Sequence, residues 1–485
     1  KETVLTPSRV VNMHMSDCLG GYDFYDEAHD QMVDEPRFVN RGKVTADTFA
    51  NAGARVLEIN SKTGLYPLYV TYSIFRSRCA ACSEEELDDA KLQQLWDAAV
   101  QENVFVICKT PMAKQITRRT LAGYRNIPVN AHYFDDLINM MKNKPRQFVD
   151  RVLKPSYWKQ EGVKTMKFDA VVGNPPYQVM DGGNKASASP IYQFFVEQSK
   201  NLNPKYVSMV IPARWYSGGK GLDQFRADML NDRRMAKLID YTNSLDCFPN
   251  VDIAGGVCYF LWDSVHNGEC YFKNISNGTE SAIDKYLDEF DTLIRYPIAD
   301  KIIRKVLAKK EGTLANIVSS RKPFGLATNV RPMGSGDLTL RYNGGTGKFE
   351  RSSVKVGTEI IDSWKVMLSY LSAEHAGQPD KNGQFKILST TEILPPKTIC
   401  TETYLIAGSF TSEVKAQNYY NYLKTKFVRF LIGQIAVSQH ITKSSFSFVP
   451  MQDFSKPWTD AELYEKYGLT DEEIAFIESM IKPME

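Results

Sequence analysis

Short apolar segments recur at regular intervals through the first half of the chain, and this recurrence is the feature that most limits its fold. They occupy residues 54–59, 104–108, 168–173, 206–211, 237–241 and 256–261, and each has the length and composition of a buried strand. Helical patterns fall between them, for example at residues 191–201 and 222–231. Strands that alternate with helices at this spacing predict an α/β domain built on a mostly parallel, Rossmann-like sheet.

The first of these segments predicts where ligands bind. Residues 54–59 are followed by the turn Asn60 to Gly64 and then by an apolar helical run at residues 65–75. This order of strand, loop and helix opens a Rossmann-like unit. Open α/β sheets bind ligands beyond the carboxyl ends of their strands, so the loops that follow residues 59 and 173 are the places to look for a site.

The chain is long enough for two domains, because single cores stop growing near ~250–300 residues and this chain has 485. After His266 the strand–helix rhythm ends, and residues 321–357 are rich in Gly, Arg and Lys. Further helices are expected at residues 414–435 and, after a Thr470 cap, at 471–480. We therefore predict a first domain at residues 1–270 and an α+β domain at residues 271–485.

Composition narrows the class of protein. A net charge of +2 neither demands nor excludes a polyanionic partner, so any basic surface must be local. The absence of a long apolar run or a signal peptide predicts a soluble, cytoplasmic protein without a membrane partner. The eight Cys are scattered, and the Cys79–Cys82 pair has no second pair to complete a metal site, so we expect reduced thiols and no metal.

The tetrapeptide Asn174-Pro175-Pro176-Tyr177 stands directly after the strand at residues 168–173 and carries the clearest chemistry. An amine conjugated to an aromatic ring is a poor nucleophile, since its lone pair is delocalised. The Asn174 amide oxygen and the Pro175 carbonyl can accept its two N–H groups and favour a reactive, pyramidal nitrogen. Tyr177 offers a ring for a flipped-out base. The alternative is a proline-rich turn that closes a strand.

On these residues the segment FDAVVGNPPY resembles the catalytic motif of N6-adenine DNA methyltransferases. The motif order is similar to that of their gamma class, in which a target recognition domain follows the catalytic domain. Type IIG restriction–modification methylases are the most similar subgroup. The resemblance covers residues 5 to about 262 and parts of the chain after residue 400. It implies S-adenosylmethionine as cofactor, double-stranded DNA as partner, and transfer of a methyl group to a flipped-out adenine.

The resemblance also implies roles for individual residues. The stretch from Leu5 to Met13 resembles the element that packs over the cofactor's methionine portion, and LEINSKTG at residues 57–64 falls at the cofactor loop. Phe248 matches the aromatic residue that packs against the flipped base. The implied cofactor-binding residues are Thr6, Pro7, Glu58, Asn60, Lys62, Gly64, Asp135, Asp136 and Ile191.

Two positions depart from the family pattern. Lys62 occupies a loop position where the family has glycine, and a side chain there is costly if the backbone needs positive φ. Lys62 is able instead to reach the cofactor's carboxylate as a cation. Lys109 and Thr110 follow the strand at residues 104–108, where the family places an acidic residue on the ribose hydroxyls. Glu58 then takes over part of that contact, with weaker cofactor binding or a site completed by DNA as the consequence.

The second domain is expected to contact DNA through Lys and Arg on phosphates and through Arg, Asn or Gln on bases. For each candidate residue, the alternative is that it lies in a solvated surface loop and does not contact DNA. The candidates are Arg321, Lys322, Arg331, Arg341, Lys348, Gln439, His440 and Lys443. No nuclease motif of the PD…(D/E)xK type and no phosphate-binding loop is present, so any endonuclease or helicase region is expected before Lys1 or on another subunit.

Two other functions remain open at this point. The same tetrapeptide serves methylation of glutamine amides and of RNA bases, although the ~200 residues after position 285 favour DNA. A catalytically degenerate module that binds DNA without modifying it is the other alternative, and Lys62 and Lys109 are its support. Cofactor binding discriminates between an active enzyme and such a module. A nicotinamide oxidoreductase is disfavoured, because the chain lacks G-x-G-x-x-G.

Overall fold

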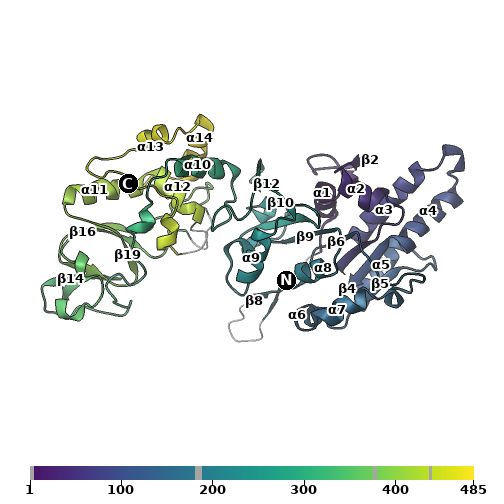
Figure 1. Cartoon of the computed structure of the whole chain (residues 1–485), viewed down its shortest axis with the longest axis horizontal. Coiled ribbons are helices and arrows are strands. Elements are labelled where there is room, and N and C mark those ends of the chain that lie inside the picture. The colour runs from purple at the N-terminus through teal and green to yellow at the C-terminus, as the bar shows by residue number, and fades with distance from the viewer. Residues whose placement is uncertain (1–4, 181–187, 375–378, 436–439, 485) are drawn as a thin grey trace. The chain divides into compact units, whose positions relative to one another are not determined.

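The computed structural model describes residues 5–180, 188–374, 379–435 and 440–484. The chain divides into two compact units, residues 1–293 and 294–485, which are drawn in Figure 1. Each unit is described by itself below. Among the described residues, no helix has the length and apolar character needed to span a bilayer.

A nine-stranded sheet forms the centre of the first unit, in the order β13-β12-β10-β11-β9-β6-β3-β4-β5. Its strands are β3 (Val56–Ser61), β4 (Val104–Cys108), β5 (Asn130–Tyr133), β6 (Ala170–Gly173), β9 (Tyr206–Pro212), β10 (Met235–Tyr241), β11 (Val257–Asp263), β12 (Cys270–Ser276) and β13 (Thr279–Lys285). The five strands from β9 to β5 are mutually parallel, whereas β11 runs antiparallel to both of its neighbours. The predicted mostly parallel α/β class is confirmed.

Helices cover both faces of this sheet. On one face are α1 (Ser8–Cys18), α3 (Leu65–Ala80), α4 (Asp89–Glu102) and α5 (Pro111–Ala122), which share a core with Val56 and Val104. On the other are α6 (Leu137–Asn143), α7 (Pro145–Val152), α8 (Tyr192–Asn201) and α9 (Asp223–Asn231), which share a core with Leu57 and Phe105. Successive strand residues point to opposite faces, so runs that are apolar throughout become buried on both sides.

The strand order reverses between β3 and β6. From β3 the chain adds β4 and then β5 on one side, and it returns to place β6 and then β9 on the other. In a doubly wound sheet this reversal opens a crevice at the carboxyl ends of the two central strands. The loop after β3 and the tetrapeptide after β6 both begin at that edge. The topology therefore brings the two predicted motifs to one place.

Smaller elements complete the first unit. The antiparallel pair β1 (Gly21–Tyr25) and β2 (Met32–Val39) precedes the short helix α2 (Lys43–Thr45) and a π-helical turn at Ala46–Ala50. A second antiparallel pair, β7 (Gln178–Met180) and β8 (Ala188–Pro190), follows the tetrapeptide Asn174 to Tyr177. This pair connects the tetrapeptide to α8.

The first unit ends later than the predicted boundary at residue 270. Strand β12 pairs with β10 in parallel, and β13 pairs with β12, so both extend the central sheet. Cys270 and Phe272 on β12 are buried in the core of the first unit. The division consequently lies at residues 293 and 294.

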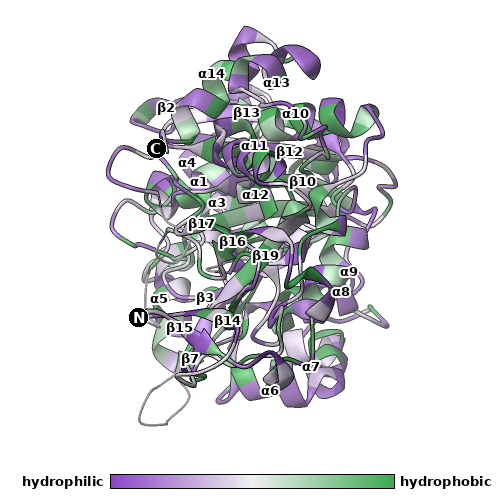
Figure 2. Ribbon diagram, turned by 90° about the vertical axis from the view of Figure 1, so that its left-hand side faces the viewer, coloured by the Kyte–Doolittle hydropathy of each residue, from purple (hydrophilic) through white to green (hydrophobic). Residues whose placement is uncertain are grey.

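The second unit mixes two three-stranded sheets with helices, which agrees with the predicted α+β class. One sheet has the order β15-β14-β18, and the other has the order β17-β16-β19 with antiparallel pairing throughout. In Figure 2 helix α13 has mostly the purple colour of hydrophilic residues. The elements are β14 (Leu338–Tyr342), β15 (Gly345–Phe349), β16 (Trp364–Ser369), β17 (Thr391–Leu394), β18 (Thr398–Cys400), β19 (Tyr404–Phe410), α10 (Pro297–Ala308), α11 (Glu413–Lys424), α12 (Lys426–Ile435), α13 (Asp460–Lys466) and α14 (Asp471–Met480).

The single helix predicted at residues 414–435 is wrong, because the structure has two helices there. Thr425 takes an extended conformation (φ −58°, ψ 150°) and separates α11 from α12. The Asp460 carboxylate accepts the backbone N–H groups of Lys426 and Phe427 at 3.1 and 2.9 Å. A distant carboxylate thus caps the start of the second helix. The helix predicted after Thr470 is confirmed as α14.

Candidate active site

The tetrapeptide Asn174-Pro175-Pro176-Tyr177 begins at the residue after β6. Gly173, the last residue of the strand, packs closely against β3. A Cβ atom at Gly173 would lie 2.6 Å from the carbonyl oxygen of Ile59. Glycine is therefore required if the end of β6 is to stay beside β3, and it places Asn174 at the point where the strand order reverses.

Asn174 is held by both its side chain and its backbone. Its Nδ2 donates to Thr6 Oγ1 at 2.9 Å, and its carbonyl oxygen accepts Asn60 Nδ2 at 3.0 Å. The residue is 8% exposed, and its buried Oδ1 has no hydrogen-bond partner among the described residues. A buried acceptor without a partner costs free energy, and such atoms concentrate at functional sites. The amide is thus fixed with its acceptor still available.

The rest of the tetrapeptide is packed into the same edge of the sheet. Pro175 and Pro176 are buried, and Tyr177 is half-buried. The Tyr177 carbonyl accepts the backbone N–H of Ile191 at 3.1 Å, which ties the loop to the start of α8. Burial raises the pKa of Tyr177 well above its ordinary value, so its hydroxyl stays neutral. Ile191, a predicted cofactor residue, is buried and supports the loop.

Strand β3 supplies two further acceptors. Glu58 and Asn60 are 5% and 3% exposed, and Glu58 Oε2 and Asn60 Oδ1 have no hydrogen-bond partner in the described part of the chain. Burial raises the pKa of Glu58 to about 8, against smaller opposing effects of Ser61 and Lys62. With Asn174, the two strands present three buried acceptors at one edge of the sheet. These suit a ligand that donates hydrogen bonds, such as one with ammonium and hydroxyl groups.

The backbone strain expected at Lys62 is absent, because Lys62 does not have a positive φ. The positions with positive φ in this loop are Asn60 (φ 76°) and Gly64 (φ 78°), and Lys62 is not one of them. Gly64 begins α3, where a Cβ atom would lie 3.1 Å from the Thr117 Cα. Burial lowers the pKa of Lys62, as does the charge of Lys109, while Glu58 opposes both. The loop therefore accommodates a lysine without backbone strain and holds it within electrostatic range of Glu58 and Lys109.

Several predicted cofactor residues make no hydrogen bond or ion pair with this cluster among the described residues. Asp135 and Asp136 are exposed and follow β5, the edge strand, which β4 separates from β3. Asp136 caps α6 by accepting Asn139 N at 3.3 Å. Pro7 caps α1, and its carbonyl accepts Val11 N at 3.1 Å. Their cofactor roles stay predictions.

Phe248, the predicted second stacking residue, is 2% exposed and belongs to the core between the sheet and α1 and α3. Its backbone N–H donates to the carbonyl of Ser244 at 2.7 Å. Among the described residues, no ring contact joins Phe248 to Tyr177. Stacking of a base between the two rings also stays a prediction.

A second pair of buried polar groups, which was not predicted from the sequence, lies near this edge. Trp215 lies in a 3-10 turn (Ala213–Ser217) after the carboxyl end of β9, and Tyr192 lies in the first turn of α8. The Trp215 Nε1 and the Tyr192 hydroxyl are buried without hydrogen-bond partners among the described residues. Both rings contact Phe225 edge-on, at 5.9 and 6.0 Å. A tryptophan directly beyond a strand that neighbours the catalytic one was the available signal.

The predicted DNA-binding residues all belong to the second unit, and three of them converge. Arg321 Nε and Lys322 Nζ each lie 3.5 Å from the Glu402 carboxylate. The Arg321 guanidinium lies 4.8 Å from the centre of the Tyr370 ring, and the His440 ring lies 4.6 Å from it. These contacts gather Arg321, Lys322 and His440 around Tyr370 and Glu402.

The other predicted DNA-binding residues are dispersed. Arg341 is ion-paired with Glu392 at 3.0 Å, and Arg331 donates to the carbonyls of Thr328 and Val330. Lys348 on β15 and Lys443, which begins a 3-10 turn, are exposed. Gln439 lies outside the described residues. Contacts with DNA stay predictions for all of them.

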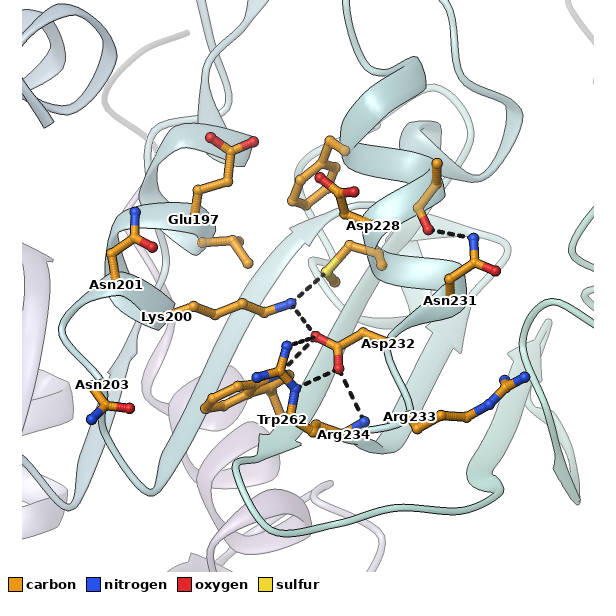
Figure 3. Close-up of a pocket in the computed structure, with 14 residues that line it drawn as sticks. Glu197, Lys200, Asn201, Asn203, Asp228, Asn231, Asp232, Arg233, Arg234 and Trp262 are labelled. Carbon is orange, nitrogen blue, oxygen red and sulfur yellow. Dashed lines mark hydrogen bonds and ion pairs between the residues drawn. The ribbon is translucent and has the colours of Figure 1, made fainter.

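A polar pocket of about 720 Å³ lies between α8, α9 and β11, and Figure 3 shows its lining. Asp232 accepts hydrogen bonds from Lys200 Nζ (3.1 Å), Arg234 Nε (2.7 Å) and Trp262 Nε1 (2.9 Å). Trp262 pairs with Val207 near the start of β9, so the pocket is at the sheet edge opposite to Asn174. Its central charges are paired within the protein, and it contains none of the predicted site residues. We interpret the residues around Asp232 as an ion-pair network that holds α8 and α9 against the sheet.

Thiols contribute no site. Cys79 and Cys82 are free and half-buried. Among the described residues, no group of three or more His, Cys, Asp or Glu side chains is placed to hold a metal ion.

The stretch that contains the tetrapeptide matches a known family. Residues 102–248 match the family described as Eco57I restriction-modification methylase. The matched stretch contains the tetrapeptide and Phe248, and it confirms the expected resemblance to restriction–modification methylases. An "uncharacterized adenine-specific methylase" from Mycoplasma pneumoniae is 41% identical over 109 residues, which cover 21% of this chain and 25% of that protein. The aligned part is thus about a quarter of the relative's length.

Solved structures with similar folds include two restriction–modification enzymes. The type IIL enzyme MmeI, solved in complex with DNA, is 11% identical with a TM-score of 0.43, covering 82% of this chain and 62% of that chain. The type IIG restriction endonuclease BpuSI is 8% identical with a TM-score of 0.41, covering 97% of this chain and 61% of that chain. At such low identities and TM-scores, neither likeness identifies a substrate or a partner.

Proposed function

We propose that this protein is an adenine-specific DNA methyltransferase of a restriction–modification system, which transfers a methyl group from S-adenosylmethionine to N6 of a flipped-out adenine. The observation that carries the proposal is the buried Oδ1 of Asn174 after β6, which has no hydrogen-bond partner among the described residues. The family match over residues 102–248 supports it. An exocyclic amine that entered this edge would find an acceptor already fixed.

In the proposed reaction, Asn174 Oδ1 accepts one N6–H and the Pro175 carbonyl accepts the other. Two fixed acceptors favour a pyramidal nitrogen, whose lone pair is then available for direct attack without a covalent enzyme intermediate. Thr6 and Asn60 keep the acceptors in position through their bonds to the Asn174 side chain and backbone. Prearranged acceptors need no reorganisation at the moment of reaction, which is where such sites gain rate.

The buried acceptors also support the choice of cofactor. When bound, S-adenosylmethionine supplies an electrophilic methyl group on a sulfonium. Glu58 and Asn60 would accept hydrogen bonds from its ammonium or hydroxyl groups, since Glu58 Oε2 and Asn60 Oδ1 have no hydrogen-bond partner among the described residues. Lys62, within electrostatic range of Glu58, would balance the cofactor's carboxylate. Thr6, Pro7, Gly64, Asp135, Asp136 and Ile191 complete the proposed cofactor site.

We further propose that residues 294–485 form the target recognition domain, which binds double-stranded DNA. The cluster of Arg321, Lys322 and His440 supports this role, because it gathers three predicted DNA contacts within one unit. A nuclease or helicase on an adjoining segment or subunit would complete a restriction–modification system.

The proposal is tested by transfer of a tritiated methyl group from S-adenosylmethionine to unmethylated bacterial DNA, with nucleoside analysis of the product. N6-methyladenine is expected, and Asn174→Ala serves as the matched inactive control. Label in RNA or in protein glutamine, with none in DNA, would reassign the substrate. Absence of label together with absence of calorimetric cofactor binding would instead identify a module that binds DNA without modifying it.

A further inference from the structure

Arg321 is restrained on one side only. Its Nε lies 3.5 Å from Glu402 Oε2, and its guanidinium carbon lies 4.8 Å from the centre of the Tyr370 ring. The side chain is 56% exposed. Within the described ranges of the chain, neither of its terminal nitrogens makes a hydrogen bond. The ring and the carboxylate therefore restrain the guanidinium on one side, and its two terminal nitrogens stay available as a planar fork.

Glu402 is itself held in place. Its side chain is 12% exposed, and its Oε1 accepts the backbone N–H of Thr328 at 3.2 Å. Burial opposes ionisation, but this bond and the charges of Lys322 and Arg321 outweigh it and lower the pKa of the carboxyl. An ionised, immobilised carboxylate is a firm anchor for the guanidinium.

The other arginines of this region use their terminal nitrogens within the protein. Arg331 stacks on Tyr342 at 5.0 Å, much as Arg321 stacks on Tyr370, but its Nη1 donates to the carbonyls of Thr328 and Val330, each at 2.9 Å. Arg341 donates through Nη1 to the Tyr342 carbonyl at 2.7 Å. Arg351 donates to both oxygens of Asp362. Arg321 thus differs from its neighbours in combining a restrained guanidinium with terminal nitrogens that make no hydrogen bond within the described part of the chain.

We propose that Arg321 recognises a guanine of the target sequence by donating to its O6 and N7 in the major groove. The proposal rests on the proposed function as a DNA methyltransferase. A planar fork matches these two acceptors, and this pairing is the commonest specific contact between arginine and DNA. A phosphate contact needs no fixed plane, and the Glu402 carboxylate beside the guanidinium would repel a phosphate group. The neighbouring carboxylate therefore favours a base edge over the DNA backbone.

The test compares the sequences methylated by the wild-type protein and by Arg321→Gln. Both proteins are incubated with S-adenosylmethionine and unmethylated genomic DNA, and N6-methyladenine is mapped by single-molecule sequencing. We expect the wild-type sites to share a guanine at one position and the variant to accept other bases there, with the remaining positions unchanged. Replacing that guanine with 7-deazaguanine in a short duplex should slow the wild-type protein about tenfold and leave the variant unaffected.

Two variants guard the interpretation. Arg321→Ala removes every donor of the side chain, so it should relax the same position even if the glutamine variant folds poorly. Arg351→Gln removes an arginine of the same unit whose two terminal nitrogens both donate to Asp362, and it should leave every position unchanged. A uniform loss of rate with an unaltered sequence would identify a phosphate contact and overturn the proposal. Absence of N6-methyladenine with the wild-type protein would overturn the proposed function instead, and the two failures are thereby distinguished.

Discussion

Replacing Glu58 with glutamine should change how the stability of the first unit depends on pH. Glu58 is 5% exposed, and burial raises its pKa to about 8, with Ser61 and Lys62 opposing. The folded chain therefore holds a proton that the unfolded chain releases near the ordinary value of 4.5. The unfolded state binds fewer protons between these two values, so the free energy of unfolding falls as the pH rises from about 4.5 to about 8.

The size of the effect follows from the two pKa values. Each pH unit between them changes the free energy of unfolding by about 1.4 kcal/mol. Between pH 5 and pH 9 the contribution of Glu58 falls by roughly 4 kcal/mol. Glu58→Gln keeps the shape of the side chain but has no carboxyl proton to lose. Relative to this variant, the wild-type protein should therefore lose roughly 4 kcal/mol of stability over that range.

Hydrogen exchange of peptides from β3, followed in increasing urea at several pH values, measures this difference. The chain has two units, and an overall melting curve would mix their transitions, whereas peptides from β3 report the unfolding of the first unit alone. Glu85→Gln, which alters an exposed glutamate, is the control and should follow the wild-type profile. Parallel pH profiles for the wild-type protein and Glu58→Gln would refute the reasoning, since they would show that the folded protein holds no extra proton on Glu58.

Three further predictions concern the catalytic edge. Asn174→Ala should lower turnover at least about a hundredfold, because it removes a fixed acceptor. The affinities for cofactor and DNA, measured by calorimetry, should stay nearly unchanged. An equal loss of DNA affinity would contradict this role. Tyr177→Ala should cost about 1–3 kcal/mol in kcat/KM through lost stacking, whereas Tyr177→Phe should be tolerated; equal damage would exclude stacking as the main role. Thr6→Val should reduce the single-turnover rate about three- to tenfold, because Asn174 loses its 2.9 Å anchor, and Thr6→Ser should restore it; an unchanged rate would show that the anchor is dispensable.

The sequence alone predicted the elements that depend on local patterns. The apolar run at residues 104–108 coincides with β4, and the tetrapeptide follows β6 as expected. Strand β3 runs to Ser61, so it includes the first two residues of the turn predicted at residues 60–64. Apolar periodicity and turn residues are read over a few positions, so they survive in the fold wherever tertiary packing agrees with them. A prediction from local patterns takes no account of distant residues. It therefore missed the break between α11 and α12 at Thr425, which Asp460 stabilises.

The sequence by itself determined that an α/β sheet carries Glu58 on one strand and Asn174 directly after another, because strand patterns and motif positions are local properties. Only the tertiary structure decided how these residues are prepared for chemistry. The bond from Asn174 to Thr6 joins residues 168 positions apart. Burial in the folded chain raises the pKa of Glu58. The backbone takes a positive φ at Asn60 rather than at Lys62. Hydrogen-bond partners, desolvation and backbone strain depend on which distant segments pack together, and the folded chain alone fixes that arrangement.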